Sequence, residues 1–152
     1  MICIIMATML EAKPFVIGLS LEKSNKGPFN EFKRDNILLV ISGVGKTCAA
    51  TTAAYCCQKY RPSSILNLGA AGATDLSHSL GEIYHINEVM ECDRPIFQTG
   101  APYTHTPHIL KGFKTTKLAT QDRAIIHAHE RKEISLHAGL VDMEGAPIVQ
   151  AC

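Results

Sequence analysis

The chain has 152 residues, of which 46% are hydrophobic and 19% charged, and its formal net charge is +1. This near balance of charge excludes electrostatic attraction to nucleic acid or to an anionic membrane as the main basis of binding. The length and the apolar content predict a single folded domain over residues 1–152, and they exclude a disordered chain.

The first half of the chain alternates apolar runs with helix-like segments. Short continuous apolar runs are typical of strands that are buried on both faces. Such strands are expected at residues 1–7, 36–42 and 64–68. One helix is expected at residues 9–19, where Pro14 is tolerable only near the first turn, and another at residues 46–60. The polar residues 20–35 predict a surface turn followed by one edge strand.

The second half of the chain continues the alternation, which predicts a largely parallel sheet covered by helices. Strands are expected at residues 82–92, 117–120 and 139–143. Helices are expected at residues 128–138 and from residue 144 onward, and a loop is expected at residues 93–108.

Small or polar residues interrupt the pattern just past four predicted strands. The interruptions lie at residues 7–11, 42–46, 69–73 and 143–145. Because ligands bind beyond the carboxyl ends of parallel strands, we expect these segments to converge on one crevice. Glu11 and Glu144 are candidate functional carboxylates there, since desolvating a carboxylate without a partner or a task is costly. For either residue alone, the alternative is an acid that stabilises the start of a helix.

Two glycine-containing segments resemble nucleotide-binding loops but lack required residues. The sequence SGVGKT at residues 42–47 would be a P-loop only with a glycine in place of Val40. It predicts instead a tight turn from strand to helix, with Lys46 in the first helical turn. The sequence GAAGA at residues 69–73 is not G-x-G-x-x-G, and no acidic residue follows at the ribose position, which disfavours a Rossmann dinucleotide site.

The six cysteines and seven histidines show no metal-binding spacing. The cysteines are predicted to be reduced and mostly buried, as in a cytoplasmic protein. The histidines are predicted to lie on the surface, among them His105, His108, His127 and His129. The first residues do not form a signal peptide, and no apolar stretch reaches the length of a membrane span. We therefore expect a cytoplasmic protein without a metal centre.

Four segments together resemble the purine nucleoside phosphorylase and nucleosidase superfamily. They are MATMLEAKPF (residues 6–15), ISGVGKTCAA (41–50), ILNLGAAGATDLSHSLGEIYHINEV (65–89) and GLVDMEGAPIVQAC (139–152). The branch that they resemble most contains the methylthioadenosine/S-adenosylhomocysteine nucleosidases and their hydrolase-like relatives, whereas residues 93–117 match poorly. The resemblance implies an α/β fold of three layers, in which helices flank a twisted, largely parallel or mixed central sheet.

The resemblance also implies hydrolysis of the N-glycosidic bond of an adenine-type purine nucleoside, without a metal or an organic cofactor. Glu11 would activate the attacking water as general base, and Glu144 would accept hydrogen bonds from the ribose hydroxyls. Met143 would pack against the sugar. An oxocarbenium-like transition state gives carboxylates near the sugar a physical reason to be there. Three further residues would line the base and the ribose: Ala71, Gly72 and Ile125.

Three positions favour water over phosphate as the nucleophile. Phosphorylases of this superfamily hold phosphate with arginines and a serine, and the resemblance aligns those positions with Glu11, Asn67 and Ala70. A carboxylate would repel a phosphate, because like charges roughly 4 Å apart cost about 4 kcal/mol at a surface-like dielectric. Related nucleoside phosphorylases that share a VDME-type segment leave phosphorolysis as an alternative.

The residue that would protonate the departing purine is not matched. In the nucleosidases it is an aspartate of an S-D motif, on a strand and helix downstream of the M-E-G helix, and the sequence ends at Cys152 within that helix. The expected fold therefore lacks the C-terminal strand and helix. Asp142 does not replace the acid, because it stands beside Met143 in the preceding strand, and a missing general acid costs roughly 10²- to 10⁴-fold in rate. A non-catalytic nucleoside-binding domain is thus the alternative to an active enzyme, and a homodimer is expected in either case.

Overall fold

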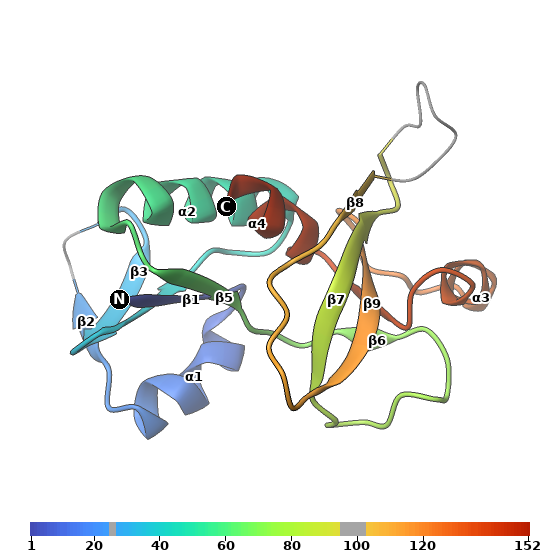
Figure 1. Cartoon of the computed structure of the whole chain (residues 1–152), viewed down its shortest axis with the longest axis horizontal. Helices are drawn as coiled ribbons and strands as arrows, with labels where there is room; N and C mark the ends of the chain where they lie inside the picture. Colours follow the sequence, from blue (N-terminus) through green and yellow to red (C-terminus); the bar gives the residue numbers. More distant parts are fainter. Residues whose placement is uncertain (25–26, 95–102) are drawn as a thin grey trace. The chain divides into compact units, whose positions relative to one another are not determined.

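The computed structural model describes residues 1–24, 27–94 and 103–152, which form two compact units (Figure 1). Unit 1 comprises Met1–Ala70 and Gln150–Cys152, and unit 2 comprises Ala71–Val149. Each unit has its own five-stranded mixed sheet with helices on its faces. The predicted class of mixed sheets flanked by helices is confirmed, whereas the single domain over residues 1–152 stays a prediction.

Unit 1 is built on a sheet with the strand order β2-β3-β4-β1-β5. The three strands predicted from apolar runs are β1 (Ile2–Met6), β4 (Ile37–Ile41) and β5 (Ser64–Asn67), and they are parallel. The strands β2 (Glu22–Ser24) and β3 (Asn30–Arg34) complete the sheet in antiparallel orientation. The carboxyl ends of β4, β1 and β5 therefore lie at one edge of this sheet.

The strands at the two edges of the unit 1 sheet differ from the prediction. Residues 20–35 contain two strands instead of one, because β2 pairs with the outer edge of β3. The strand β5, expected to be buried on both faces, is only half-buried at Ile65 and Leu66. Among the described residues it is the last strand in the pairing order and pairs with β1 alone, so one of its edges has no neighbouring strand.

Helices cover both faces of the unit 1 sheet, as Figure 1 shows. The helix α1 (Met9–Gly18) packs on the face that carries Ile4. Neighbouring residues of a strand point to opposite faces, so Cys3 lies on the other face. There its thiol forms a hydrogen bond with Cys56 of α2 (Lys46–Tyr60). Unit 1 thus has the helix–sheet–helix layering that the alternation of segments predicts.

Helix α1 contains Pro14 in its second turn, later than the sequence leads us to expect. The side chain of Thr8 caps the helix by accepting a hydrogen bond from the amide of Glu11. Ala12 and Val16 pack against the core of the sheet. A proline inside a helix costs about 3 kcal/mol, so capping and packing together outweigh the hydrogen bond that Pro14 cannot make.

Unit 2 is built on a sheet with the strand order β6-β10-β9-β7-β8. Its parallel strands β7 (Tyr84–Glu91), β9 (Lys114–Thr120) and β10 (Leu140–Asp142) lie where strands are predicted, although β9 begins earlier than expected. Two short antiparallel strands flank them: β6 (Gly72–Ala73) and β8 (Tyr103–His105). Both form by pairing with an existing edge, without an apolar run that would predict them. Of the loop predicted at residues 93–108, residues 95–102 lie outside the described residues.

Helices also cover both faces of the unit 2 sheet (Figure 1). One face carries a cluster of Met90, Ala119, Ile134 and Ala138, and the other carries Val89, Leu118 and Ala146. Because adjacent strand residues point to opposite faces, the helices that complete these clusters lie on opposite sides of the sheet. They are α3 (Ala128–Ser135), which ends earlier than predicted, and α4 (Gly145–Ala151).

The cysteines are free, but fewer of them are buried than predicted. Cys3 and Cys56 are buried and Cys57 is half-buried, whereas three are exposed: Cys48, Cys92 and Cys152. The apolar run around Cys3 indicates its burial correctly. The small residues of α2 occur all around that helix, so the sequence does not indicate which side meets the sheet. The hydrogen bond between the two buried thiols raises the pKa of Cys3 and lowers the pKa of Cys56.

Most of the histidines named as surface residues are exposed. His108, His127 and His129 are exposed, whereas His105 is half-buried because it belongs to the edge strand β8. Among the described residues, no cluster of three or more His, Cys, Asp or Glu side chains has an arrangement that could hold a metal ion. Within residues 1–24, 27–94 and 103–152, no helix combines the length and the apolar character that a membrane span requires.

A buried carboxylate joins the strand β3 to the helix α2. The side chain of Glu31 is fully buried, and its two oxygens accept hydrogen bonds of 2.7 Å from the hydroxyls of Tyr55 and Tyr60. Lys59 adds an ion pair at 3.9 Å. Burial raises the pKa of Tyr60 to about 12, so this hydroxyl remains a donor at neutral pH. These partners offset the cost of removing the Glu31 carboxylate from water.

Replacing Glu31 by glutamine should lower the free energy of unfolding by about 2 kcal/mol. The amide keeps the shape of the side chain, but it places a donor where a tyrosine hydroxyl donates, and it removes the charge that Lys59 contacts. Urea denaturation followed by circular dichroism measures the change. The control variant Glu22→Gln, on the exposed side chain of β2, should change stability by less than about 0.5 kcal/mol. A Glu31→Gln variant as stable as this control would contradict the stabilising role of the network.

Candidate functional site

Segments that follow three strand ends lie together in unit 1. The amide of Ser42 donates to the carbonyl of Met6 at 2.9 Å, so the end of β4 lies beside the end of β1. The amide of Leu68 donates to the carbonyl of Ile5 at 3.1 Å, which brings the end of β5 to the same strand. Two of the predicted segments, residues 7–11 and 42–46, therefore leave one edge of the sheet together with the first two residues of the third, residues 69–73.

Glu11 lies at this edge, half-buried in the first turn of α1, and its carboxylate accepts three hydrogen bonds. Its Oε2 accepts from the amide and the hydroxyl of Thr8 at 2.9 and 2.7 Å. Its Oε1 accepts from the amide of Ala70 at 3.0 Å. The carboxylate thus caps α1 and also binds the segment after β5. The alternative role of Glu11 as a helix-start acid is therefore observed, and it leaves room for a second role because a carboxylate has about four acceptor positions.

Gly69 allows the segment after β5 to approach Glu11 closely. A Cβ atom at this position would lie 3.1 Å from Oε1 of Glu11. A larger residue would therefore push the carboxylate away from the amide of Ala70. Gly69, the first residue of GAAGA, thus serves the approach to a carboxylate of the protein itself.

The segment after β4 is the tight turn that the sequence predicts in place of a P-loop. Gly43 and Gly45 have φ angles of +87° and +99°, in the left-handed range that favours glycine. The hydroxyl of Ser42 donates to the carbonyl of Gly43 at 2.8 Å and fixes the turn. Helix α2 then begins at Lys46, as predicted.

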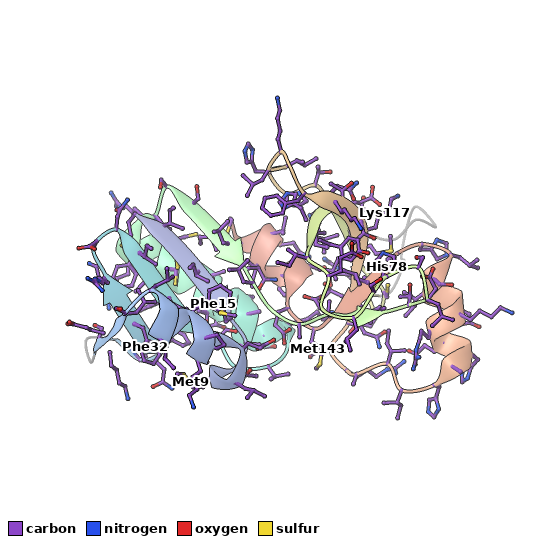
Figure 2. All side chains as sticks on the ribbon, turned by 90° about the horizontal axis from the view of Figure 1, so that it is seen from below. Met9, Phe15, Phe32, His78, Lys117 and Met143 are labelled. Carbon is purple, nitrogen blue, oxygen red and sulfur yellow. The ribbon has the colours of Figure 1, made fainter. Side chains whose placement is uncertain are left out.

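In unit 2, Met143 and Glu144 directly follow β10 and are half-buried; Met143 is labelled in Figure 2. The preceding residue, Asp142, accepts a hydrogen bond from the hydroxyl of Thr120 at 2.6 Å and another from the amide of Gly145 at 2.7 Å. Burial raises the pKa of Asp142, although these hydrogen bonds act in the opposite direction. The turn that carries Met143 and Glu144 is therefore held from both sides.

The other predicted site residues of unit 2 lie around the same strand. Gly72 of β6 pairs with Val141 of β10, and a Cβ atom at Gly72 would lie 3.1 Å from Cγ2 of Val141. Ala71 precedes this pair and is exposed. Ile125 packs against the cluster under α3, as does Val141. Strand β10 thus links the segments that carry Ala71, Gly72 and Ile125.

Two interactions hold the loop that carries Ile125. The amide of Asp122 donates to Oδ2 of Asp93 at 2.7 Å, which joins the segments after β9 and β7. Arg123 forms a two-pronged ion pair with Glu130 of α3. The hydrogen bonds of this pair raise the pKa of Arg123 and lower the pKa of Glu130. An exposed pair of this kind adds little stability, but it constrains the path of the loop.

The structure therefore groups five of the six predicted site residues around β10 in unit 2 and holds Glu11 in unit 1. Their roles toward a ligand stay predictions. Sequence reasoning missed Thr8 and Thr120 and gave Asp142 no role. The spacing of Thr8 and Glu11 is that of a capping box, so this signal was present in the sequence. The contact between Asp142 and Thr120 joins residues 22 positions apart, and no local pattern reveals it.

Comparison with known proteins gives a family match and several curated relatives. Residues 20–140 match the family described as the phosphorylase superfamily. The 5'-methylthioadenosine/S-adenosylhomocysteine nucleosidase of Staphylococcus epidermidis is 28% identical over 105 residues, which cover 69% of this chain and 45% of the relative. The enzyme of the same name from Staphylococcus aureus strain MRSA252 is 25% identical over 144 residues, covering 79% of this chain and 63% of the relative. The chain thus spans between about half and two thirds of the length of these relatives.

Solved structures share the fold over nearly the whole chain. A futalosine hydrolase mutant of Helicobacter pylori matches with a TM-score of 0.86 and 18% identity. A mutant nucleosidase of the same species, with 5'-methylthioadenosine in its active site, matches with a TM-score of 0.87 and 17% identity. The Neisseria meningitidis nucleosidase in complex with methylthio-immucillin-A matches with a TM-score of 0.84 and 19% identity. Each match covers 99% of this chain and 78% of the other chain, so the predicted nucleoside phosphorylase-like fold is confirmed.

The variant Gly69→Ala should weaken the hydrogen bond between Glu11 and the amide of Ala70. The added Cβ atom would meet Oε1 of Glu11 at 3.1 Å and displace it. Losing a hydrogen bond of about 1 kcal/mol should speed exchange of the Ala70 amide proton roughly fivefold, as measured by NMR. The control is Gly18→Ala, where a Cβ atom meets nothing within 4 Å. Equal exchange of the Ala70 amide in both variants would contradict the close approach.

Proposed function

Because this chain belongs to the phosphorylase superfamily, we propose that it binds an adenine-type nucleoside and hydrolyses the N-glycosidic bond. The curated relatives named as nucleosidases support this assignment. The observation that carries it is the Glu11 carboxylate, fixed by Thr8 and Ala70 at the carboxyl edge of the unit 1 sheet. Ligands of parallel α/β sheets bind beyond such an edge.

Glu11 activates the attacking water in this proposal. The Oε2 atom is occupied by two donors from Thr8, whereas Oε1 accepts one hydrogen bond from Ala70 and has acceptor capacity left for a water. A general base must lie within hydrogen-bond reach of the water that it activates, and the free acceptor position of Oε1 provides that contact. Glu11 takes one water proton as the water oxygen bonds to the anomeric carbon and the bond to the adenine nitrogen breaks; solvent supplies the proton to the departing adenine, and Glu11 returns its own proton to solvent.

The residues around β10 bind the nucleoside in this proposal. Glu144 accepts hydrogen bonds from the ribose hydroxyls and Met143 packs against the sugar. The small residues Ala71 and Gly72 allow close approach of the base and ribose, and Ile125 packs near the purine. A transition state with positive charge on the sugar is stabilised by nearby carboxylates, so the same groups serve both binding and rate.

Water is favoured over phosphate as the nucleophile by the groups beside Glu11. Ala70, whose amide binds Glu11, and Asn67 at the end of β5 carry neutral, exposed side chains. A phosphate in contact with Glu11 would meet a like charge, at a cost of roughly 1 to 4 kcal/mol depending on the local dielectric. Hydrolysis therefore needs no added phosphate.

Binding without turnover is the second candidate. It is favoured by the three hydrogen bonds of Glu11, which hold the start of α1 and the segment after β5 and need no chemistry to explain them. The residues proposed to bind the ribose and line the base do not depend on a catalytic role of Glu11. The two candidates therefore share a ligand and differ only in whether adenine is released.

Calorimetric titration with 5'-methylthioadenosine, paired with chromatographic detection of adenine, tests the proposal. The chain should bind the nucleoside, and adenine release should not increase with added inorganic phosphate. The variant Glu11→Gln should retain binding but lower release roughly 10²- to 10⁴-fold, because the amide cannot accept the water proton. The exposed variant Glu22→Gln is the matched control and should release adenine like the unaltered chain.

The outcomes separate the candidates. Binding without any adenine after long incubation would select the binding domain over the hydrolase. Release that requires phosphate would make the chain a phosphorylase. Unchanged release by Glu11→Gln would show that another group activates the water, and absence of nucleoside binding would overturn the proposed function altogether.

A further inference from the structure

A hydrogen-bonded pair in unit 2, formed by buried Thr120 and half-buried Asp142, has no part in the proposed chemistry. Thr120, the last residue of β9, is fully buried, and its hydroxyl donates to Oδ1 of Asp142 at 2.6 Å. The same hydroxyl oxygen accepts the amide of Ala146 at 3.1 Å. The second carboxylate oxygen of Asp142 accepts the amide of Gly145 at 2.7 Å. Two side chains therefore satisfy amides of the first turn of α4, which would otherwise lack partners.

The hydrogen bonds of this pair hold both ends of the turn that carries the two residues proposed to contact the sugar. Met143 and Glu144 are the two residues between Asp142 and Gly145, so their backbone is fixed where the chain leaves β10 and where it enters α4. The amide of Glu144 also donates to the carboxylate of Asp142. The direction in which the Glu144 side chain leaves the turn therefore depends on Asp142.

The backbone at Gly145 packs closely against its neighbours. A Cβ atom at this position would lie 2.5 Å from Cδ2 of Leu118 and 3.1 Å from Oδ2 of Asp142. The turn is thus pressed against β9 and against the carboxylate. A group held this tightly can orient a neighbouring side chain with little loss of entropy when a ligand binds.

We propose that Asp142 and Thr120 are positioning residues, which hold Glu144 in the orientation that receives the ribose hydroxyls. This inference rests on the proposed function of the site. It assigns the pair no contact with the ligand and no proton transfer. Its consequence is selective: loss of the pair weakens recognition of the sugar and leaves recognition of the free base unchanged.

An amide cannot replace the carboxylate of Asp142. The hydroxyl of Thr120 and the amide of Gly145 each donate to one of its oxygens. In Asp142→Asn one of these donors faces an NH₂ group, so the turn must shift to avoid two opposed donors. Thr120→Val removes the hydroxyl at constant shape, whereas Thr120→Ser retains it. This series separates the hydrogen bond from the space that the side chain fills.

The test compares calorimetric affinities for adenine and for 5'-methylthioadenosine, using the full chain. Asp142→Asn and Thr120→Val should each weaken nucleoside binding roughly tenfold or more, while adenine affinity changes by less than about twofold. Thr120→Ser should bind both ligands like the unaltered chain. The matched control is Asp35→Asn, which alters a side chain that is 90% exposed and should change neither affinity.

A double-mutant cycle with Glu144→Gln shows whether the pair acts through Glu144. Once Glu144→Gln has removed the preference for the nucleoside, adding Asp142→Asn should change that preference no further. If Glu144→Gln removes the preference but Asp142→Asn and Thr120→Val do not, the positioning role is overturned and the proposed function stands. An equal loss of adenine and nucleoside affinity in Asp142→Asn and Thr120→Val would show a merely structural role and overturn it as well. If the unaltered chain binds the nucleoside without preferring it over adenine, the positioning role is overturned, and if it does not bind the nucleoside at all, the proposed function itself has failed.

Discussion

A helix that starts directly after a buried strand has amide groups without partners, and this constraint shapes both parts of the candidate site. Helix α1 begins just past β1, and the side chains of Thr8 and Glu11 satisfy its start. Helix α4 begins just past β10, where Asp142 and Thr120 do the same. The acids at these two junctions thus serve the start of a helix before any ligand is considered, and the proposed chemistry uses carboxylates whose orientation the fold already restrains.

Capping and catalysis are compatible in Glu11 because they use different parts of one side chain. The Oε2 atom accepts from Thr8 and caps the helix, whereas the Oε1 atom accepts from the segment after β5. A carboxylate held by several donors loses little rotamer freedom when it orients a water. The same restraint limits substitution, because a residue that keeps the negative charge on a shorter side chain would lose the hydrogen bonds with Thr8 that cap the helix.

The sequence predicted the elements that are determined by the residues of one short segment. Apolar runs located β1 and β4, and the glycines before Lys46 located the start of α2. The short strands β2, β6 and β8 were missed, because they form by pairing with an edge and carry no signal of their own. The exposure of Cys48 was missed because the small residues of α2 do not distinguish its faces. The contact between Thr120 and Asp142 depends on the alignment of two strands, which no single segment encodes. The homodimer and the cytoplasmic location stay predictions.

The hydrogen bond from position 70 to Glu11 comes from the main chain, and this has a consequence for mutational tolerance. Any amino acid except proline supplies that donor, and the side chain of Ala70 is exposed, so the position can vary without cost to the carboxylate. The neighbouring Gly69 has no such freedom. Two adjacent residues of one small-residue loop thus differ in tolerance: a side chain at position 70 leaves the carboxylate in place, whereas a side chain at position 69 displaces it.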